Sequence, residues 1–148
     1  MFETNSPDET QAIAKQIASQ AQPGDIYLLN GEMGAGKTAF SKGFAQGLGI
    51  NQHITSPTFT ILNIYEEGRL PLYHFDLYRV EDDIHDQGFE DYFFGKGVCL
   101  IEWGQYAMDI IGQGEYHTID ITKDLSQGEN YRQIQMTHLL PLFINTTD

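Results

Sequence analysis

The sequence predicts one α/β domain over residues 1–148, in which helices flank a sheet of mixed parallel and antiparallel strands. Three observations predict this class. An apolar run at residues 26–29 leads through a glycine-rich loop into a helical pattern. A second apolar run, residues 98–101, is typical of a parallel strand buried on both faces. Strand patterns at 58–75 and 116–136 each flank a polar connection, and predict two antiparallel hairpins.

The first elements are a helix and a strand. Ser6 is followed by Pro-Asp-Glu, a capping box with proline at the first helical position, so a helix is expected to begin there. Isoleucine and alanine at helical spacing extend it to about Ala21, and Gln-Pro-Gly-Asp at 22–25 ends it. The strand over residues 26–29 comes next.

The second helix is expected over about residues 37–48, because phenylalanine and leucine recur there every fourth residue and Gly49 follows. A loop over 51–57 then leads into the first hairpin, whose strands are expected at 58–65 and 70–75.

The second half of the chain begins with an acidic stretch, residues 80–94, which is expected to be helical and precedes the strand at 98–101. The last hairpin is expected to pair 116–121 with 131–136, and the chain after Pro141 is expected to fray.

The charge balance is strongly acidic, with 21 Asp and Glu against 8 Lys and Arg and a formal net charge of -13. Nucleic-acid binders neutralise phosphates with Lys and Arg, so no direct nucleic-acid binding is expected. The one cysteine, Cys99, offers no disulfide framework and suits a reducing cytoplasm. No signal pattern or membrane-length apolar run is present, so we expect a cytoplasmic protein with no membrane partner.

Residues 31–38 read Gly-Glu-Met-Gly-Ala-Gly-Lys-Thr, a complete P-loop between a strand and a helix. The backbone N–H groups of such a loop bind phosphate oxygens. Lys37 reaches the β- and γ-phosphates, and the Thr38 hydroxyl is placed to bind Mg²⁺. The motif predicts a P-loop NTPase-like fold. The nucleotide contacts expected from it are Glu32, Met33, Gly34, Ala35, Gly36, Lys37 and Thr38.

A P-loop needs a second carboxylate at the end of a neighbouring strand, to hold Mg²⁺ or orient the attacking water. Asp76 and Glu102 each end an apolar strand pattern, at the edge where ligands collect in open α/β sheets. The alternative for each is an ordinary solvated acid.

Three further residues have two interpretations each. Ser56 and Thr58, in Thr-Ser-Pro-Thr-Phe at 55–59, either sense the γ-phosphate or belong to an ordinary turn and strand. Trp103 either borders the active site or is a core aromatic.

Four stretches together resemble the TsaE (YjeE) family, the small ATPase of bacterial tRNA threonylcarbamoyladenosine synthesis. They are Leu-Asn and the P-loop at 29–38, Thr-Ser-Pro-Thr-Phe at 55–59, His-Phe-Asp-Leu-Tyr-Arg at 74–79 and Ile-Glu-Trp at 101–103. The P-loop alone is generic, but the other elements in this order and spacing are specific, and the resemblance covers nearly the whole chain.

The resemblance implies that ATP and Mg²⁺ bind at the P-loop, with Thr38 and Glu102 on the metal and Asp76 as the second acid that hydrolysis needs. The catalytic residues so expected are Lys37, Asp76 and Glu102. Further nucleotide contacts implied by the resemblance come from Thr10, Trp103 and Arg132.

The resemblance also implies a partner, the TsaD–TsaB heterodimer, in which TsaD transfers threonylcarbamoyl to adenosine of tRNA. Hydrolysis is expected to be slow alone and stimulated by that pair. Two alternatives remain. One is a small nucleotide or metabolite kinase, which is disfavoured because such enzymes need several arginines to hold a second phosphorylated substrate and this chain has three. The other is a non-catalytic nucleotide-sensing module. A GTPase is rejected. Its guanine-binding motif reads Asn/Thr-Lys-x-Asp, and in Thr122-Lys123-Asp124 the aspartate comes one position too early.

Overall fold

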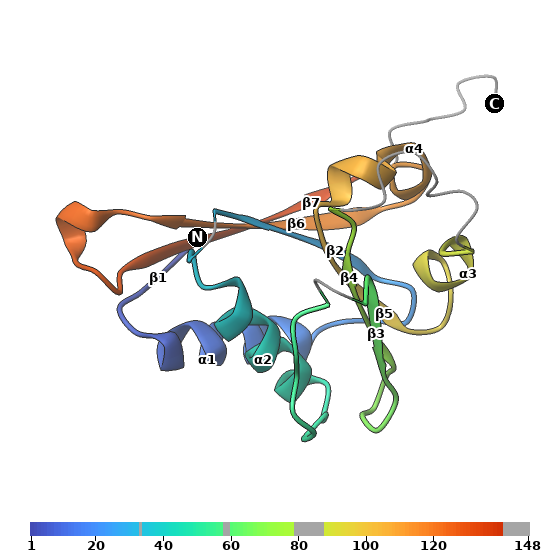
Figure 1. The fold of residues 1–148 in the computed structure, drawn as a ribbon, viewed down its shortest axis with the longest axis horizontal. Helices are drawn as coiled ribbons and strands as arrows, with labels where there is room; N and C mark the ends of the chain where they lie inside the picture. The colour runs from blue at the N-terminus through green and yellow to red at the C-terminus, as the bar shows by residue number, and fades with distance from the viewer. Residues whose placement is uncertain (33, 58–59, 79–87, 141–148) are drawn as a thin grey trace.

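The computed structural model describes residues 1–32, 34–57, 60–78 and 88–140. It contains a seven-stranded mixed sheet in the order β1-β7-β6-β2-β5-β4-β3, with helices packed on the sheet, and confirms the predicted class (Figure 1). The strands are β1 (Phe2–Thr4), β2 (Ile26–Gly31), β3 (Leu62–Tyr65), β4 (Leu72–Asp76), β5 (Val98–Glu102), β6 (Tyr116–Lys123) and β7 (Arg132–Leu139). The α-helices are α1 (Pro7–Ala18), α2 (Lys37–Gly47), α3 (Glu90–Phe93) and α4 (Met108–Ile111), and the 3-10 turns are η2 (Gly104–Ala107) and η3 (Leu125–Gln127).

The centre of the sheet is parallel. β2 pairs with β5 on one side and with β6 on the other, and β5 also pairs with β4. β5 is the buried central strand that the apolar run predicted, since its first four residues have no solvent exposure. The three remaining pairings, β1 with β7, β6 with β7 and β3 with β4, are antiparallel, and two of them are the predicted hairpins.

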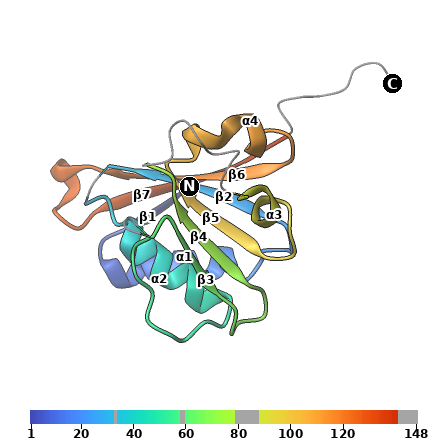
Figure 2. The ribbon, with the colours of Figure 1, turned by 45° about the vertical axis from the view of Figure 1, so that its right-hand side comes forward.

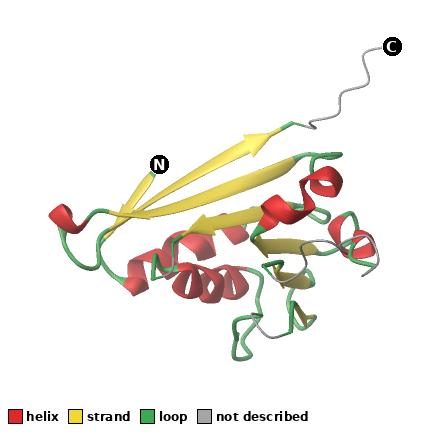
Figure 3. Cartoon of the chain, turned by 45° about the horizontal axis from the view of Figure 1, so that its top comes forward, coloured by secondary structure: helices red, strands yellow, loops and turns green. Residues whose placement is uncertain are grey.

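The helices form two layers (Figures 2 and 3). α1 and α2 lie together on one face, where Phe40 and Phe44 of α2 are fully buried against the sheet. Gly43 permits this approach, because a Cβ there would collide with the backbone of Gln11 on α1. α3 and α4 cover the other face, packing on residues such as Phe75. In the described part of the chain, no helix has the length and apolarity that crossing a membrane requires.

Several predicted boundaries are corrected. α1 ends at Ala18 and not near Ala21, because the N–H groups of Gln20 and Ala21 donate to carbonyls three residues earlier and no longer four. β3 begins at Leu62, since the N–H groups of Thr60 and Ile61 both donate to the carbonyl of Pro57 and form a turn where a strand was expected. β6 and β7 are both longer at their C-terminal ends than predicted.

Other predictions fall partly outside the described residues. Of the helix expected over 80–94, the described part is helical only in α3, and residues 80–87 and the tail after 140 are not described. β1 and α4 were missed, because elements of three and four residues are too short to show a period.

Candidate functional site

The P-loop connects the C-terminal end of β2 to the first turn of α2. Gly34 and Gly36 have φ angles of +78° and +102°, a region that L-residues with side chains rarely adopt, so the two glycines are needed for this backbone path. Gly36 is also the N-cap residue of α2, and it has no side chain that could accept a hydrogen bond from the first N–H groups of the helix. The first N–H groups of the helix therefore remain available to phosphate oxygens, as in anion sites at helix N-termini.

Lys37 meets the first predicted acid directly. Its Nζ lies 3.5 Å from Oε1 of Glu102, and the two side chains are only 18% and 13% exposed. They meet because β5 lies directly beside β2, with Glu102 opposite Leu29 in the pairing. The structure thus brings together two residues that are 65 positions apart and that the sequence analysis placed in one site.

His74 of β4 holds the other oxygen of the same carboxylate, with its Nε2 3.2 Å from Oε2 of Glu102. Burial alone would raise the pKa of Glu102, but His74 and then Lys37 outweigh it, so the pKa lies below its usual value. Glu102 is therefore an ionised carboxylate at neutral pH, which is the form that binds a metal ion. The sequence analysis missed His74; its one signal was its position two residues before Asp76, on the same face of a strand.

Asp76 lies directly opposite Glu102 in the parallel pairing of β4 with β5, so the two predicted acids are neighbours. Asp76 is 8% exposed, and its Oδ1 accepts the N–H of Tyr78 at 3.1 Å. Neither acid is the solvated strand-end carboxylate of the alternative interpretation. Their roles in metal binding and hydrolysis stay predictions.

Trp103 borders this group and is not a core aromatic. It is 37% exposed, and the Lys37 Nζ lies 5.9 Å from its ring centroid, in the range of a cation–π contact. Its φ of +61° is unusual for a bulky residue, and the ring packs on Tyr78 with centroids 4.8 Å apart.

Arg132 holds the P-loop from outside. Its Nε donates to the carbonyl of Ala35 at 2.9 Å, and its Nη2 donates to the carbonyl of Gly34 at 3.1 Å. The structure therefore supports a position at the loop for this residue, which the resemblance alone had implied. These bonds fix the loop backbone, and a direct contact of Arg132 with a nucleotide stays a prediction.

Thr10 occupies a more interior position. Its hydroxyl is 2.8 Å from that of Thr4, and Thr10 is 1% exposed. Thr4 lies opposite Arg132 in the pairing of β1 with β7. Thr10 thus supports the strand beside Arg132, and its direct contact with a nucleotide stays a prediction.

The remaining predicted residues are in two groups. Thr38, the second residue of α2, and Glu32 in the loop are both exposed, and their contacts with a metal ion or nucleotide stay predictions. Ser56 is exposed in the loop after α2. Met33 and Thr58 lie outside the described residues.

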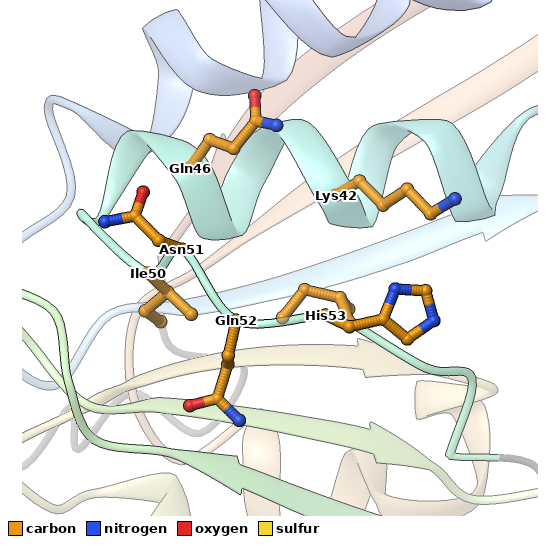
Figure 4. Close-up of a pocket in the computed structure, with 7 residues that line it drawn as sticks. Lys42, Gln46, Ile50, Asn51, Gln52 and His53 are labelled. Atoms are coloured by element: carbon orange, nitrogen blue, oxygen red, sulfur yellow. The ribbon is translucent and has the colours of Figure 1, made fainter.

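A hollow of about 210 Å³ lies beside the second half of α2 (Figure 4). It is lined by Lys42, Gln46, Ile50, Asn51, Gln52, His53 and Ile54. None of the predicted site residues is among them, so this hollow is separate from the predicted nucleotide site.

We expect Arg132→Ala to weaken ATP binding by about tenfold, because it removes two charge-assisted hydrogen bonds that shape the P-loop. Arg69→Ala is the matched control, since Arg69 also donates to two backbone carbonyls, those of Ala18 and Ala21, at the far end of α1. Calorimetric titration with ATP should separate the two variants, while thermal unfolding should show both destabilised. Equal ATP affinity in the two variants would remove Arg132 from the site.

The comparisons with known proteins agree on one family. A family model described as threonylcarbamoyl adenosine biosynthesis protein TsaE matches residues 4–134. The chain is 57% identical over 112 residues to the tRNA threonylcarbamoyladenosine biosynthesis protein TsaE of Bacillus subtilis, covering 76% of this chain and 71% of that protein. It is 44% identical over 104 residues to the protein of the same name from Treponema pallidum, covering 69% and 76%.

A solved structure supports the fold. The crystal structure of Bacillus subtilis YdiB is similar with a TM-score of 0.78 and 42% sequence identity, covering 94% of this chain and 84% of that chain. The predicted P-loop NTPase-like fold, with its mixed sheet and flanking helices, is therefore confirmed.

Proposed function

The chain belongs to the TsaE family, which acts in threonylcarbamoyladenosine biosynthesis on tRNA, and from that premise we propose that it is a Mg²⁺-dependent ATPase. The observation that carries the proposal is the contact of Lys37 with Glu102 at the P-loop. A phosphate-binding ammonium and a metal-binding carboxylate thus lie within reach of the same ligand, as ATP hydrolysis requires.

The residues present fit a magnesium nucleotide. Hydroxyl and carboxylate oxygens are the ligands that Mg²⁺ prefers, and Thr38 and Glu102 would supply one of each. When bound, the metal ion supplies positive charge to the β- and γ-phosphates. Lys37 and the loop N–H groups would hold the phosphates. Asp76, beside Glu102 in the sheet, would orient the attacking water.

We propose further that hydrolysis is slow in the isolated cytoplasmic protein and is stimulated by the TsaD–TsaB heterodimer. A supplied arginine, or a loop that a partner orders, raises the rates of such enzymes by about 10³–10⁵. The two arginines in the described part of the chain are Arg69 and Arg132, and each donates to backbone carbonyls. Neither is left to stabilise the charge of a transferring phosphoryl group, which supports dependence on a partner and disfavours the alternative of a small nucleotide or metabolite kinase.

The decisive experiment measures ATP hydrolysis by the purified protein with and without the TsaD–TsaB pair. We expect a slow basal rate, clear stimulation by the pair, and loss of that stimulation in Lys37→Ala. Phosphoryl transfer from ATP to a small-molecule acceptor without any partner would favour the kinase, and ATP binding with no hydrolysis in either condition would favour the sensing module.

A second measurement tests the charge argument. The net charge of -13 predicts no measurable affinity of the isolated protein for tRNA at physiological salt, since its 8 Lys and Arg are outnumbered by 21 Asp and Glu, which repel phosphates. Tight, salt-sensitive tRNA binding in a gel-shift assay would contradict this prediction.

A further inference from the structure

Lys123, the last residue of β6, reaches the P-loop from a part of the chain outside the motif. β6 runs parallel to β2, and Ile121 lies opposite Gly31, the residue at which β2 ends and the loop begins. Ile119 and Ile121 are buried on the face that α1 and α2 cover. Because side chains alternate along a strand, Lys123 is the next residue on that face.

The ammonium group of Lys123 lies over Gly34 of the loop. A Cβ placed on Gly34 would stand 3.3 Å from the Nζ of Lys123. The position comes from the β6–β7 hairpin, whose strands extend as a long arm with η3 at its tip (Figure 3). Lys123 is also paired across that hairpin with Arg132, which holds the same loop.

The charge of Lys123 has no counterion in the described part of the chain. The neighbouring carboxylate of Asp124 instead accepts the N–H and the hydroxyl of Ser126. Lys37, by contrast, is already paired with Glu102. In a chain with only 8 basic residues against 21 acidic ones, an unpaired ammonium over a phosphate-binding loop is a free site for an anion.

We propose that Lys123 is a further nucleotide-binding residue, whose ammonium binds the phosphate chain at the Gly34 side of the loop. This inference rests on the proposed function, because it takes the ligand to be a nucleoside triphosphate. It adds a second ammonium, from the C-terminal hairpin, to the one that the P-loop motif supplies.

The test compares Lys123→Met, which keeps the apolar stem and removes the charge, with Lys123→Arg, which keeps the charge. Calorimetric titration with ATP in the presence of Mg²⁺ should show about tenfold weaker binding for Lys123→Met, as expected for one charge-assisted hydrogen bond. Lys123→Arg should bind within about threefold of the unchanged protein on the same grounds. Lys96→Met, at an exposed lysine between α3 and β5, is the control and should bind normally.

Two further readouts separate a phosphate contact from a structural role. The loss in Lys123→Met should be larger for ATP than for AMP, and it should shrink as salt is raised, because screening weakens an exposed charge contact. Thermal unfolding without nucleotide should be unchanged. Equal losses for ATP and AMP, equal losses in the Met and Arg variants, or unchanged ATP binding in Lys123→Met would each overturn the proposal. If the unchanged protein itself bound no ATP, the proposed function would fail instead.

Discussion

Lys37→Ala is expected to weaken ATP binding by at least about 100-fold, the largest effect of any single substitution in the site, since charged hydrogen bonds to a ligand are worth about 1.5–3 kcal/mol each. The substitution removes the ammonium that reaches the β- and γ-phosphates. It also leaves the Glu102 carboxylate without the cation now 3.5 Å away, so a negative charge would face the incoming phosphates.

Calorimetric titration of Lys37→Ala with Mg²⁺ and ATP measures this loss. Lys42→Ala is the matched control, because Lys42 lies on the same helix more than one turn further on, beside the hollow and away from the loop. Both variants should unfold at similar temperatures. Unchanged ATP affinity in Lys37→Ala would reject the P-loop as the nucleotide site.

The second large effect is expected on turnover and not on binding. Asp76→Asn should still bind ATP, but its hydrolysis rate should fall by a factor of about 10²–10⁴. This is the usual contribution of a group that positions or deprotonates the nucleophile. The amide keeps an oxygen for the Tyr78 N–H, so the buried position should remain intact. Glu102→Gln should lose turnover as well and should also need more Mg²⁺, because it removes the charged metal ligand.

Single-turnover hydrolysis across a range of Mg²⁺ concentrations distinguishes the two roles. Asp91→Asn, at an exposed acid of α3, serves as the control for removing one negative charge. Hydrolysis at the unchanged rate in Asp76→Asn and Glu102→Gln would mean that the two acids are structural, and would leave the nucleotide-sensing module as the better interpretation.

The parts of the site that the sequence could predict are those with a local signal. The P-loop is a contiguous motif, and Asp76 and Glu102 each end an apolar strand pattern, at the edge where ligands collect in open α/β sheets. The fold class was predictable for the same reason, since β2, β5 and the two hairpins each have a clear pattern.

The parts that could not be predicted depend on pairing between distant strands. Nothing near His74 in the sequence shows that β4 lies beside β5, and nothing near Lys123 shows that β6 lies beside β2. Arg132 was implied only by the family resemblance. Propensity also failed at residues 60–61, where two hydrogen bonds to one carbonyl favour a turn over the strand that the composition predicted.

The pairing of β1 with β7 has a consequence for the order in which the protein is made. The P-loop is synthesised early, but Arg132, which holds it, follows Ala35 by 97 residues. β1 is translated well before β7, the strand with which it pairs in the described part of the chain. Chains grow from the N-terminus at about 5–20 residues per second, so β1 and the loop wait several seconds for their support. A nascent chain that stops before β7 would therefore carry the whole P-loop motif and still lack the strand that braces it.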